Sequence, residues 1–121
     1  MGRSLVGQYI LIVEDEYFIA ADLARALEAE GATILGPFCD LVLAMKAARE
    51  NHIDLALLDV NLNGEHCYSV AELLKDRAVP FLFLTGYDRA TLPERFRSVP
   101  RLTKPFSTGA VLREIGQLVV D

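Results

Sequence analysis

Carboxylates follow two short aliphatic runs of this sequence, at positions where they could take part in chemistry. Glu14 and Asp15 come directly after the aliphatic residues 11–13, and Asp59 follows residues 55–58. Two unit charges about 5 Å apart repel by roughly 3 kcal/mol at an effective dielectric constant of about 20, so acids that lie together require a cation. Carboxylate oxygens with room for water are the ligands that Mg²⁺ prefers. If the three acids meet in the fold, they predict a magnesium site.

Two further residues follow apolar stretches and could act on a phosphoryl group. Thr85 comes after residues 81–84, and Lys104 stands before Pro105 near the end of the chain. The lysine ammonium is a compact cation suited to a phosphate oxygen. A cation, a lysine, a hydroxyl and a carboxylate nucleophile together are the components of phosphoryl transfer onto an aspartate.

The elements that must position these residues alternate along the chain. We expect strands at about 8–13, 32–38, 54–59, 79–86 and 99–103, and helices at about 16–30, 40–51 and 65–76, in a short segment beginning at Pro93, and from Ser107 or Thr108 onward. Gly31 is predicted to stop the first helix, Gly36-Pro37 to close the second strand and Asp40 to cap the second helix. Such β-α alternation, five times over, predicts a parallel sheet with helices on both faces.

In a doubly wound sheet, ligands bind beyond the carboxyl ends of the strands, where the strand order reverses. We predict a flavodoxin-like α/β fold, (βα)5, with a parallel five-stranded sheet in the order 2-1-3-4-5, which reverses between strands 1 and 3. The acids after strands 1 and 3, the threonine of strand 4 and the lysine after strand 5 then rise at one rim. Nearby, Glu16 is expected to complement the dipole of the first helix. We expect four aromatic side chains mostly in the core: Tyr17, Phe18, Phe81 and Phe83.

Composition bounds the class of protein. The 121 residues, 52% of them hydrophobic, suffice for a single domain over residues 1–121 and are too few for two. No apolar run approaches the ~20 residues of a membrane span, and the first residues lack the apolar stretch of a secretion signal, so we expect a cytoplasmic protein. Cys39 and Cys67 are then expected as reduced thiols. The net charge of −5 argues against nucleic-acid binding.

The sequence resembles the receiver domains of two-component response regulators over essentially its whole length. The resemblance rests on Glu14 and Asp15 after "LIV", Asp59 in "LALLDVNL", Thr85 in "FLFLTG", and Lys104 before Pro-Phe. It implies a signalling domain of a phosphorelay and not an enzyme. The stretch Phe83-Leu84-Thr85-Gly86-Tyr87 resembles a receiver subgroup with a Phe-x-Thr-Gly-Tyr motif, which is often found with histidine kinases of the HWE/HisKA2 type.

The family implies a role for each residue of the phosphoryl-transfer group. Asp59 takes a phosphoryl group from a histidine kinase, a phosphotransfer protein or a small donor such as acetyl phosphate, and the resulting change in conformation signals to a protein partner. Thr85 hydrogen-bonds the phosphoryl group, and Lys104 pairs with it. The Lys104–Pro105 bond is expected to be cis, which would hold the ammonium at the site.

The same resemblance implies Mg²⁺ as the cofactor. Asp15, Asp59 and the backbone carbonyl of Asn61 are its expected ligands, and Glu14 acts directly or through bound water. It implies no contact of this domain with nucleic acid or membrane.

One residue departs from the family pattern. Receivers usually carry an aromatic residue three positions before the lysine, where this sequence has Arg101. We expect Arg101 to point outward, because burying an unpaired guanidinium would cost several kcal/mol.

Two other functions stay open. A pseudo-receiver would keep the fold as an interaction module without phosphorylation. An aspartyl-phosphate phosphatase of the haloacid dehalogenase type would need an aspartate where Asn61 stands, and this chain has no room for a cap domain.

Overall fold

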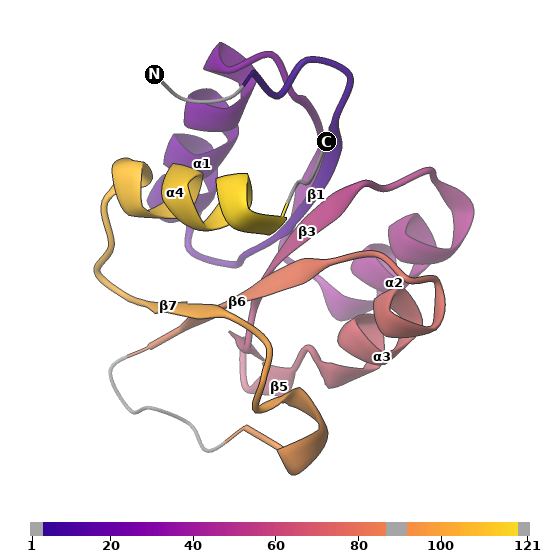
Figure 1. Ribbon diagram of the computed structural model, residues 1–121. Helices are drawn as coiled ribbons and strands as arrows, with labels where there is room; N and C mark the ends of the chain where they lie inside the picture. Colours follow the sequence, from indigo (N-terminus) through magenta and orange to yellow (C-terminus); the bar gives the residue numbers. More distant parts are fainter. Residues whose placement is uncertain (1–3, 87–91, 119–121) are drawn as a thin grey trace.

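A parallel five-stranded sheet forms the centre of the computed structural model, which describes residues 4–86 and 92–118 (Figure 1). The strand order is β2-β1-β3-β6-β7, and every neighbouring pair is parallel. The strands are β1 (Tyr9–Val13), β2 (Thr33–Phe38), β3 (Leu55–Asp59), β6 (Phe81–Thr85) and β7 (Arg101–Thr103). An antiparallel pair, β4 (Asn61–Leu62) and β5 (Glu65–His66), forms a separate hairpin. With the hairpin left out of the count, the sheet has the predicted order 2-1-3-4-5.

Helices cover both faces of the sheet. In Figure 1, α1 (Tyr17–Ala29) and α4 (Thr108–Leu118) lie on one face, and α2 (Leu41–Glu50) and α3 (Tyr68–Asp76) lie on the other. Each face has its own apolar core, one with side chains of α1 and α4 and the other with side chains of α2 and α3. All five residues of β3 are buried because both of its faces are covered. That is why this strand reads as a continuous aliphatic run.

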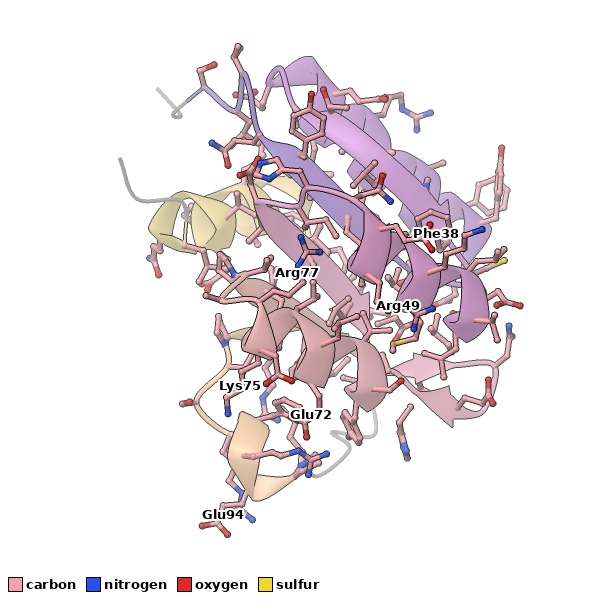
Figure 2. All side chains as sticks on the ribbon, turned by 90° about the vertical axis from the view of Figure 1, so that its right-hand side faces the viewer. Phe38, Arg49, Glu72, Lys75, Arg77 and Glu94 are labelled. Carbon is pink, nitrogen blue, oxygen red and sulfur yellow. The ribbon has the colours of Figure 1, made fainter. Side chains whose placement is uncertain are left out.

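Polar groups at the helix ends explain where the helices begin and end. The Asp40 carboxylate accepts a hydrogen bond from the Leu43 amide at 3.0 Å and caps α2, as predicted. Ser107 caps α4, since its hydroxyl accepts a hydrogen bond from the Ala110 amide at 3.1 Å. At the other end of α2, Arg77, which Figure 2 labels, donates from Nη1 to the carbonyl of Asn51 at 3.0 Å and to that of Ala48.

One predicted boundary is wrong, and one predicted strand ending differs in detail. The helix expected from residue 65 begins at Tyr68, because the hairpin occupies the preceding residues. The second strand, expected at about 32–38, spans Thr33–Phe38, but Gly36-Pro37, which were expected to close it, lie inside it. Gly36 makes this possible: it has φ +98°, and a Cβ there would lie 2.8 Å from the Ile12 carbonyl oxygen. Its conformation and its close approach to β1 both require glycine.

Two of the four aromatic side chains expected in the core are exposed. Phe81 and Phe83 are 7% and 0% exposed, but Tyr17 and Phe18 are 76% and 80% exposed. The buried stripe of α1 consists of Ala20, Leu23 and Leu27. Phe18 precedes Ala20 by two residues, a rotation of roughly 200° around a helix of 3.6 residues per turn, and so faces away from the sheet. Tyr17 and Phe18 contact each other edge to face, with ring centroids 5.4 Å apart.

The crossover from β6 to β7 contains a 3₁₀ helix, η1 (Glu94–Phe96), in its described part. Phe96 is fully buried, and its ring lies 5.5 Å from that of Phe83 and 5.6 Å from that of Tyr68. The expected short helix near Pro93 is therefore a single 3₁₀ turn anchored by one aromatic side chain. Tyr87 of the sequence motif lies outside the described residues.

The remaining expectations from composition concern the cysteines and membrane spans. Cys39 is exposed, Cys67 is buried, and both are free thiols. Within residues 4–86 and 92–118, the helices are all too short or too polar to span a bilayer.

Candidate functional site

Four sheet strands bring the predicted site residues to one rim. Glu14 follows β1, Asp59 ends β3, Thr85 ends β6 and Lys104 follows β7. These strands are neighbours in the sheet and run parallel, so their carboxyl ends lie together. Glu14, Asp59, Thr85 and Lys104 are buried, and Asp15 is half-buried. A buried strand end does not usually carry this many ionisable groups, since unpaired charges are costly to bury.

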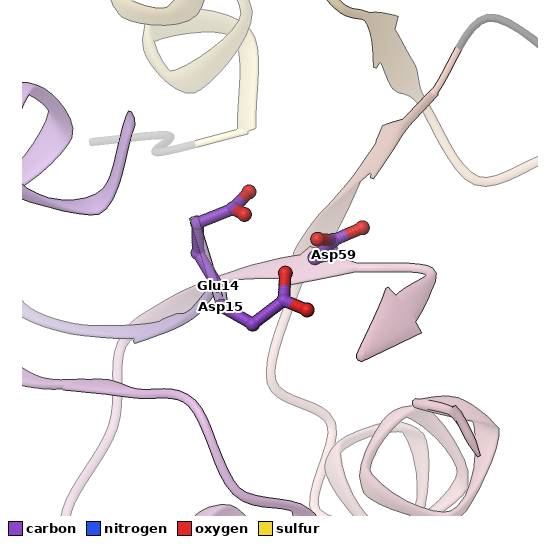
Figure 3. A group of neighbouring side chains, drawn as sticks. All are labelled: Glu14, Asp15 and Asp59. Carbon is purple, nitrogen blue, oxygen red and sulfur yellow. The ribbon is translucent and has the colours of Figure 1, made fainter. Parts of the chain in front are cut away.

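The three acids meet as predicted (Figure 3). One carboxylate oxygen each from Glu14, Asp15 and Asp59 lies within 4.8 Å of the other two. β1 delivers the first two acids and β3 delivers the third, across the pair of strands where the sheet order reverses. The geometry is that of a small oxygen-ligand cluster.

The ammonium of Lys104 lies among carboxylates. Its Nζ is 2.9 Å and 3.0 Å from the two Glu14 carboxylate oxygens and 3.2 Å from Asp59 Oδ2. The contact with Glu16 Oε2 is shorter still, at 2.5 Å. Three acids from β1, β3 and the start of α1 therefore surround one cation.

Sequence reasoning missed this role of Glu16. Glu16 is the N-cap residue of α1, but its side chain makes no capping hydrogen bond and reaches Lys104 instead. A usable signal was present: Glu14 and Glu16 are two residues apart, and Glu16 still has extended backbone angles (φ −87°, ψ 111°). Residues two apart in an extended segment point to the same side, so both acids face the lysine.

The hairpin after β3 was also missed, and it fixes two of the acids. The Asn61 amide donates to Asp59 Oδ1 at 3.1 Å, and the Asn63 amide donates to Asp15 Oδ2 at 2.9 Å. Asn63 and Gly64 have φ of 50° and 90°, as a type I′ hairpin turn requires. The Asn-Gly dipeptide is the sequence signal for such a turn. Through it, the chain after β3 is tied to the end of β1.

Thr85 faces the same rim from β6. Its hydroxyl oxygen lies 3.4 Å from both the Leu102 carbonyl and Thr103 Oγ1, at the long limit of hydrogen bonding. Its own carbonyl accepts a hydrogen bond from the Lys104 amide at 2.8 Å. The hydroxyl is thus only weakly engaged. Arg101, three residues before the lysine, is exposed in β7 as predicted.

A cavity of about 490 Å³ opens over these groups. Its lining includes Asp15, Glu16, Asp59, Asn61, Thr85 and Lys104. Its size suffices for a phosphoryl group and several water molecules, since one water occupies about 30 Å³ in the liquid.

Burial and neighbouring charges shift the acid–base properties of the site. Burial, followed by the nearby Glu14 charge, raises the pKa of Asp59 from 3.8 to about 7, and Lys104 only partly opposes this. Burial alone would lower the pKa of Lys104, but its hydrogen bonds with Glu16 and Glu14 outweigh burial, and the lysine pKa is raised. In this arrangement Lys104 is positively charged, and Asp59 stays protonated to a higher pH than an ordinary aspartate does.

The residues fit a divalent cation of the magnesium type. Three carboxylates converge, with one oxygen of each within 4.8 Å of the other two. Their negative charges repel one another and exceed the single charge of Lys104, so a divalent cation would relieve the remaining repulsion. All-oxygen donors with adjoining space for water are the coordination that Mg²⁺ prefers.

Residues 10–115 match the family described as Response regulator receiver domain. The chain belongs to this family. This receiver domain is 32% identical over 114 residues to the transcriptional regulatory protein PdtaR of Mycobacterium tuberculosis and 35% identical over 128 residues to the phyllosphere-induced regulator PhyR of Methylorubrum extorquens. The two matches cover 91% and 96% of this chain but only 56% and 46% of the relatives. The chain thus spans about half the length of these relatives.

Solved structures show the same relationship. The solution structure of SdrG from Sphingomonas melonis Fr1 is 41% identical with a TM-score of 0.83, covering 97% of this chain and 99% of that one. The BeF3-activated conformation of SdrG from Pseudomonas melonis Fr1 is 40% identical with a TM-score of 0.75, covering 92% and 96%. Receiver domains are signalling domains that interact with histidine kinases and generally bind Mg²⁺ at an acidic pocket.

Proposed function

We propose that this receiver domain accepts a phosphoryl group on Asp59. The observation that carries the proposal is the position of this buried carboxylate, on the cavity wall and 3.2 Å from Lys104 Nζ. An Asp59 carboxylate oxygen forms a bond to phosphorus while the bond from phosphorus to the leaving group breaks. The leaving group, the imidazole of a phosphohistidine or the acetate of acetyl phosphate, departs with the electron pair.

The other site residues support this transfer in distinct ways. Lys104 is the fixed cation for the phosphoryl oxygens, and Thr85 has a weakly engaged hydroxyl at the same rim. Glu14, Asp15, Asp59 and the backbone carbonyl of Asn61 are the residues that would hold Mg²⁺. When bound, Mg²⁺ neutralises the negative charge that gathers as a phosphoryl group approaches carboxylates.

The proposal extends to the organisation and partners of the protein. Residues 1–121 act as one cytoplasmic receiver domain, whose changed conformation is read by a downstream protein. The stretch 83–87 supports membership of the Phe-x-Thr-Gly-Tyr subgroup, with a kinase of the HWE/HisKA2 type or a phosphotransfer protein as donor. The similarity to SdrG and PhyR supports this assignment.

Substitution of the acceptor tests the proposal. With acetyl phosphate and Mg²⁺, intact-mass spectrometry should show one added phosphoryl group on the wild-type protein and none on Asp59→Asn. Asp76→Asn is the matched control, since Asp76 is exposed at the end of α3 and should be modified like wild type. Equal modification of Asp59→Asn would assign the acceptor elsewhere. Absence of modification in the wild-type protein would favour a pseudo-receiver.

A further inference from the structure

The ammonium of Lys104 has no free hydrogen-bond donor in this structure. A lysine ammonium has three N–H donors. Three carboxylates lie within reach of Nζ: Glu14 at 2.9 Å and 3.0 Å, Asp59 at 3.2 Å and Glu16 at 2.5 Å. A phosphoryl oxygen that is to pair with Lys104 must therefore displace one of these acids.

The three carboxylates differ in how easily they can leave. The side chains of Glu14 and Asp59 are 0% and 5% exposed, whereas that of Glu16 is 58% exposed. An acid withdrawn from the lysine must be hydrated, and only Glu16 can reach water without unfolding of the rim. Asp59 is moreover the group that carries the phosphoryl in the proposed function. Glu16 is thus the partner that can be exchanged.

The backbone of Glu16 stays in place during such an exchange. Its amide donates to Glu14 Oε2 at 2.9 Å, and its carbonyl accepts from the Ala20 amide at 2.9 Å in the first turn of α1. Release of Lys104 then requires only rotation of the Glu16 side chain into solvent. Side-chain rotations at exposed positions are fast compared with loop or domain motions.

From this geometry we propose that Glu16 is a positioning residue that holds Lys104 before phosphorylation and gives up its place to a phosphoryl oxygen during transfer. The inference rests on the proposed function. In the step itself, an Asp59 oxygen bonds to phosphorus and acetate leaves acetyl phosphate with the electron pair. At the same time the Lys104 contact passes from the Glu16 carboxylate to a phosphoryl oxygen. Glu16 competes with the donor for the lysine through this contact, so its presence slows phosphorylation.

Glu16→Gln should therefore be phosphorylated faster than wild type. At acetyl phosphate concentrations well below saturation, we expect the rate to rise about threefold to fivefold, the upper part of the range for losing one partly exposed charge contact. The gain should lie in the concentration of acetyl phosphate needed for half-maximal rate, with little change in the maximal rate. Phosphorylation is followed by intact mass, and circular dichroism confirms that the variant is folded.

Three further variants separate a specific contact from a general effect of charge. Glu65→Gln makes the same change in net charge at an exposed residue of the neighbouring hairpin. It should leave the rate within about twofold of wild type, as expected for an exposed charge that is not among the Lys104 contacts. Glu16→Asp keeps the charge but shortens the side chain by one methylene, and should behave like Glu16→Gln. In a Lys104→Met background, Glu16→Gln should have no effect on the rate.

The outcomes that would overturn the inference are distinct from those that test the proposed function. Phosphorylation of wild type and Glu16→Gln at equal rates, a slower Glu16→Gln variant, or an equal acceleration by Glu65→Gln would each overturn the role of Glu16 and leave Asp59 as the acceptor. A wild-type protein that gains no phosphoryl group would overturn the proposed function and this inference with it.

Discussion

Replacing Lys104 with methionine removes the ammonium and keeps a flexible side chain of similar reach. The lysine side chain is 9% exposed, and its carboxylate partners on Glu14 and Asp59 are 0% and 5% exposed. In the absence of metal, the variant therefore leaves two buried acids without their cation. Removal of one partner from a buried ion pair typically costs about 3–5 kcal/mol. We expect a loss of about 3 kcal/mol in the free energy of unfolding at about pH 8.

The loss should depend on pH in a defined direction. The folded-state pKa of Asp59 is raised from 3.8 to about 7, so its contribution to stability is fully present below about pH 4 and is lost as the pH rises through about 7. Lys104 opposes this shift, and without it the pKa rises further. The loss then continues above pH 7 in the variant, at about 1.4 kcal/mol for each pH unit and proton. The difference between wild type and Lys104→Met should thus grow from pH 6 to pH 8.

Urea denaturation with a chelator present measures this difference, and repetition with Mg²⁺ adds a second result. Mg²⁺ should stabilise the variant more than the wild type, because in the variant the ion no longer competes with an ammonium for the same carboxylates. A Lys104→Met protein as stable as wild type at about pH 8 without metal would refute the electrostatic reasoning. So would a destabilisation that is independent of pH.

Two other predictions concern the metal and the sheet. The affinity for Mg²⁺ should rise up to tenfold per pH unit between about pH 5 and 7 and level off above, because Asp59 must lose its proton to become a ligand. Calorimetry in buffers of different ionisation enthalpy measures the released proton. An affinity that does not change with pH over this range would contradict the raised pKa of Asp59. Gly36→Ala should destabilise the protein by roughly 2 kcal/mol or more, since φ is +98° and the new Cβ would lie 2.8 Å from the Ile12 oxygen. Gly116→Ala, in α4 with open space around its Cβ position, should be neutral or stabilising by about 0.5–1 kcal/mol in the same thermal unfolding assay.

The parts of the fold that follow from hydrophobic periodicity were predictable from the sequence. β3 and β6 are continuous apolar runs because they are buried on both faces. The acid and the threonine at their ends therefore follow from their positions in the chain. The meeting of Glu14, Asp15 and Asp59 required only the parallel order of the strands. The register of a parallel sheet fixes where the ends of neighbouring strands lie, so residues at strand ends can be placed from the sequence.

The features that were missed depend on local backbone angles or on which side of an element faces the core. Glu16 looked like part of a helix, but its extended backbone turns its carboxylate toward Lys104. Apolar character placed Phe18 in the core, whereas the helix phase set by Ala20 puts it in solvent. The continuation of β2 past Gly36 depends on a positive φ that an apolar pattern does not encode.

Edge-to-face packing of the Phe96 ring of η1 against Phe83 connects the end of β6 to the crossover. Phe83 lies two residues before Thr85, on the same face of β6, and its ring is 5.5 Å from that of Phe96. Protein interiors are nearly incompressible, so a displacement of Thr85 toward the site would move Phe83 and push on Phe96. η1 carries Phe96 inside and Glu94 and Arg95 outside, and it would shift with that ring. Although Arg101 stands in place of the usual aromatic residue, a displacement at Thr85 would therefore still reach the outer surface, through Phe83 and Phe96.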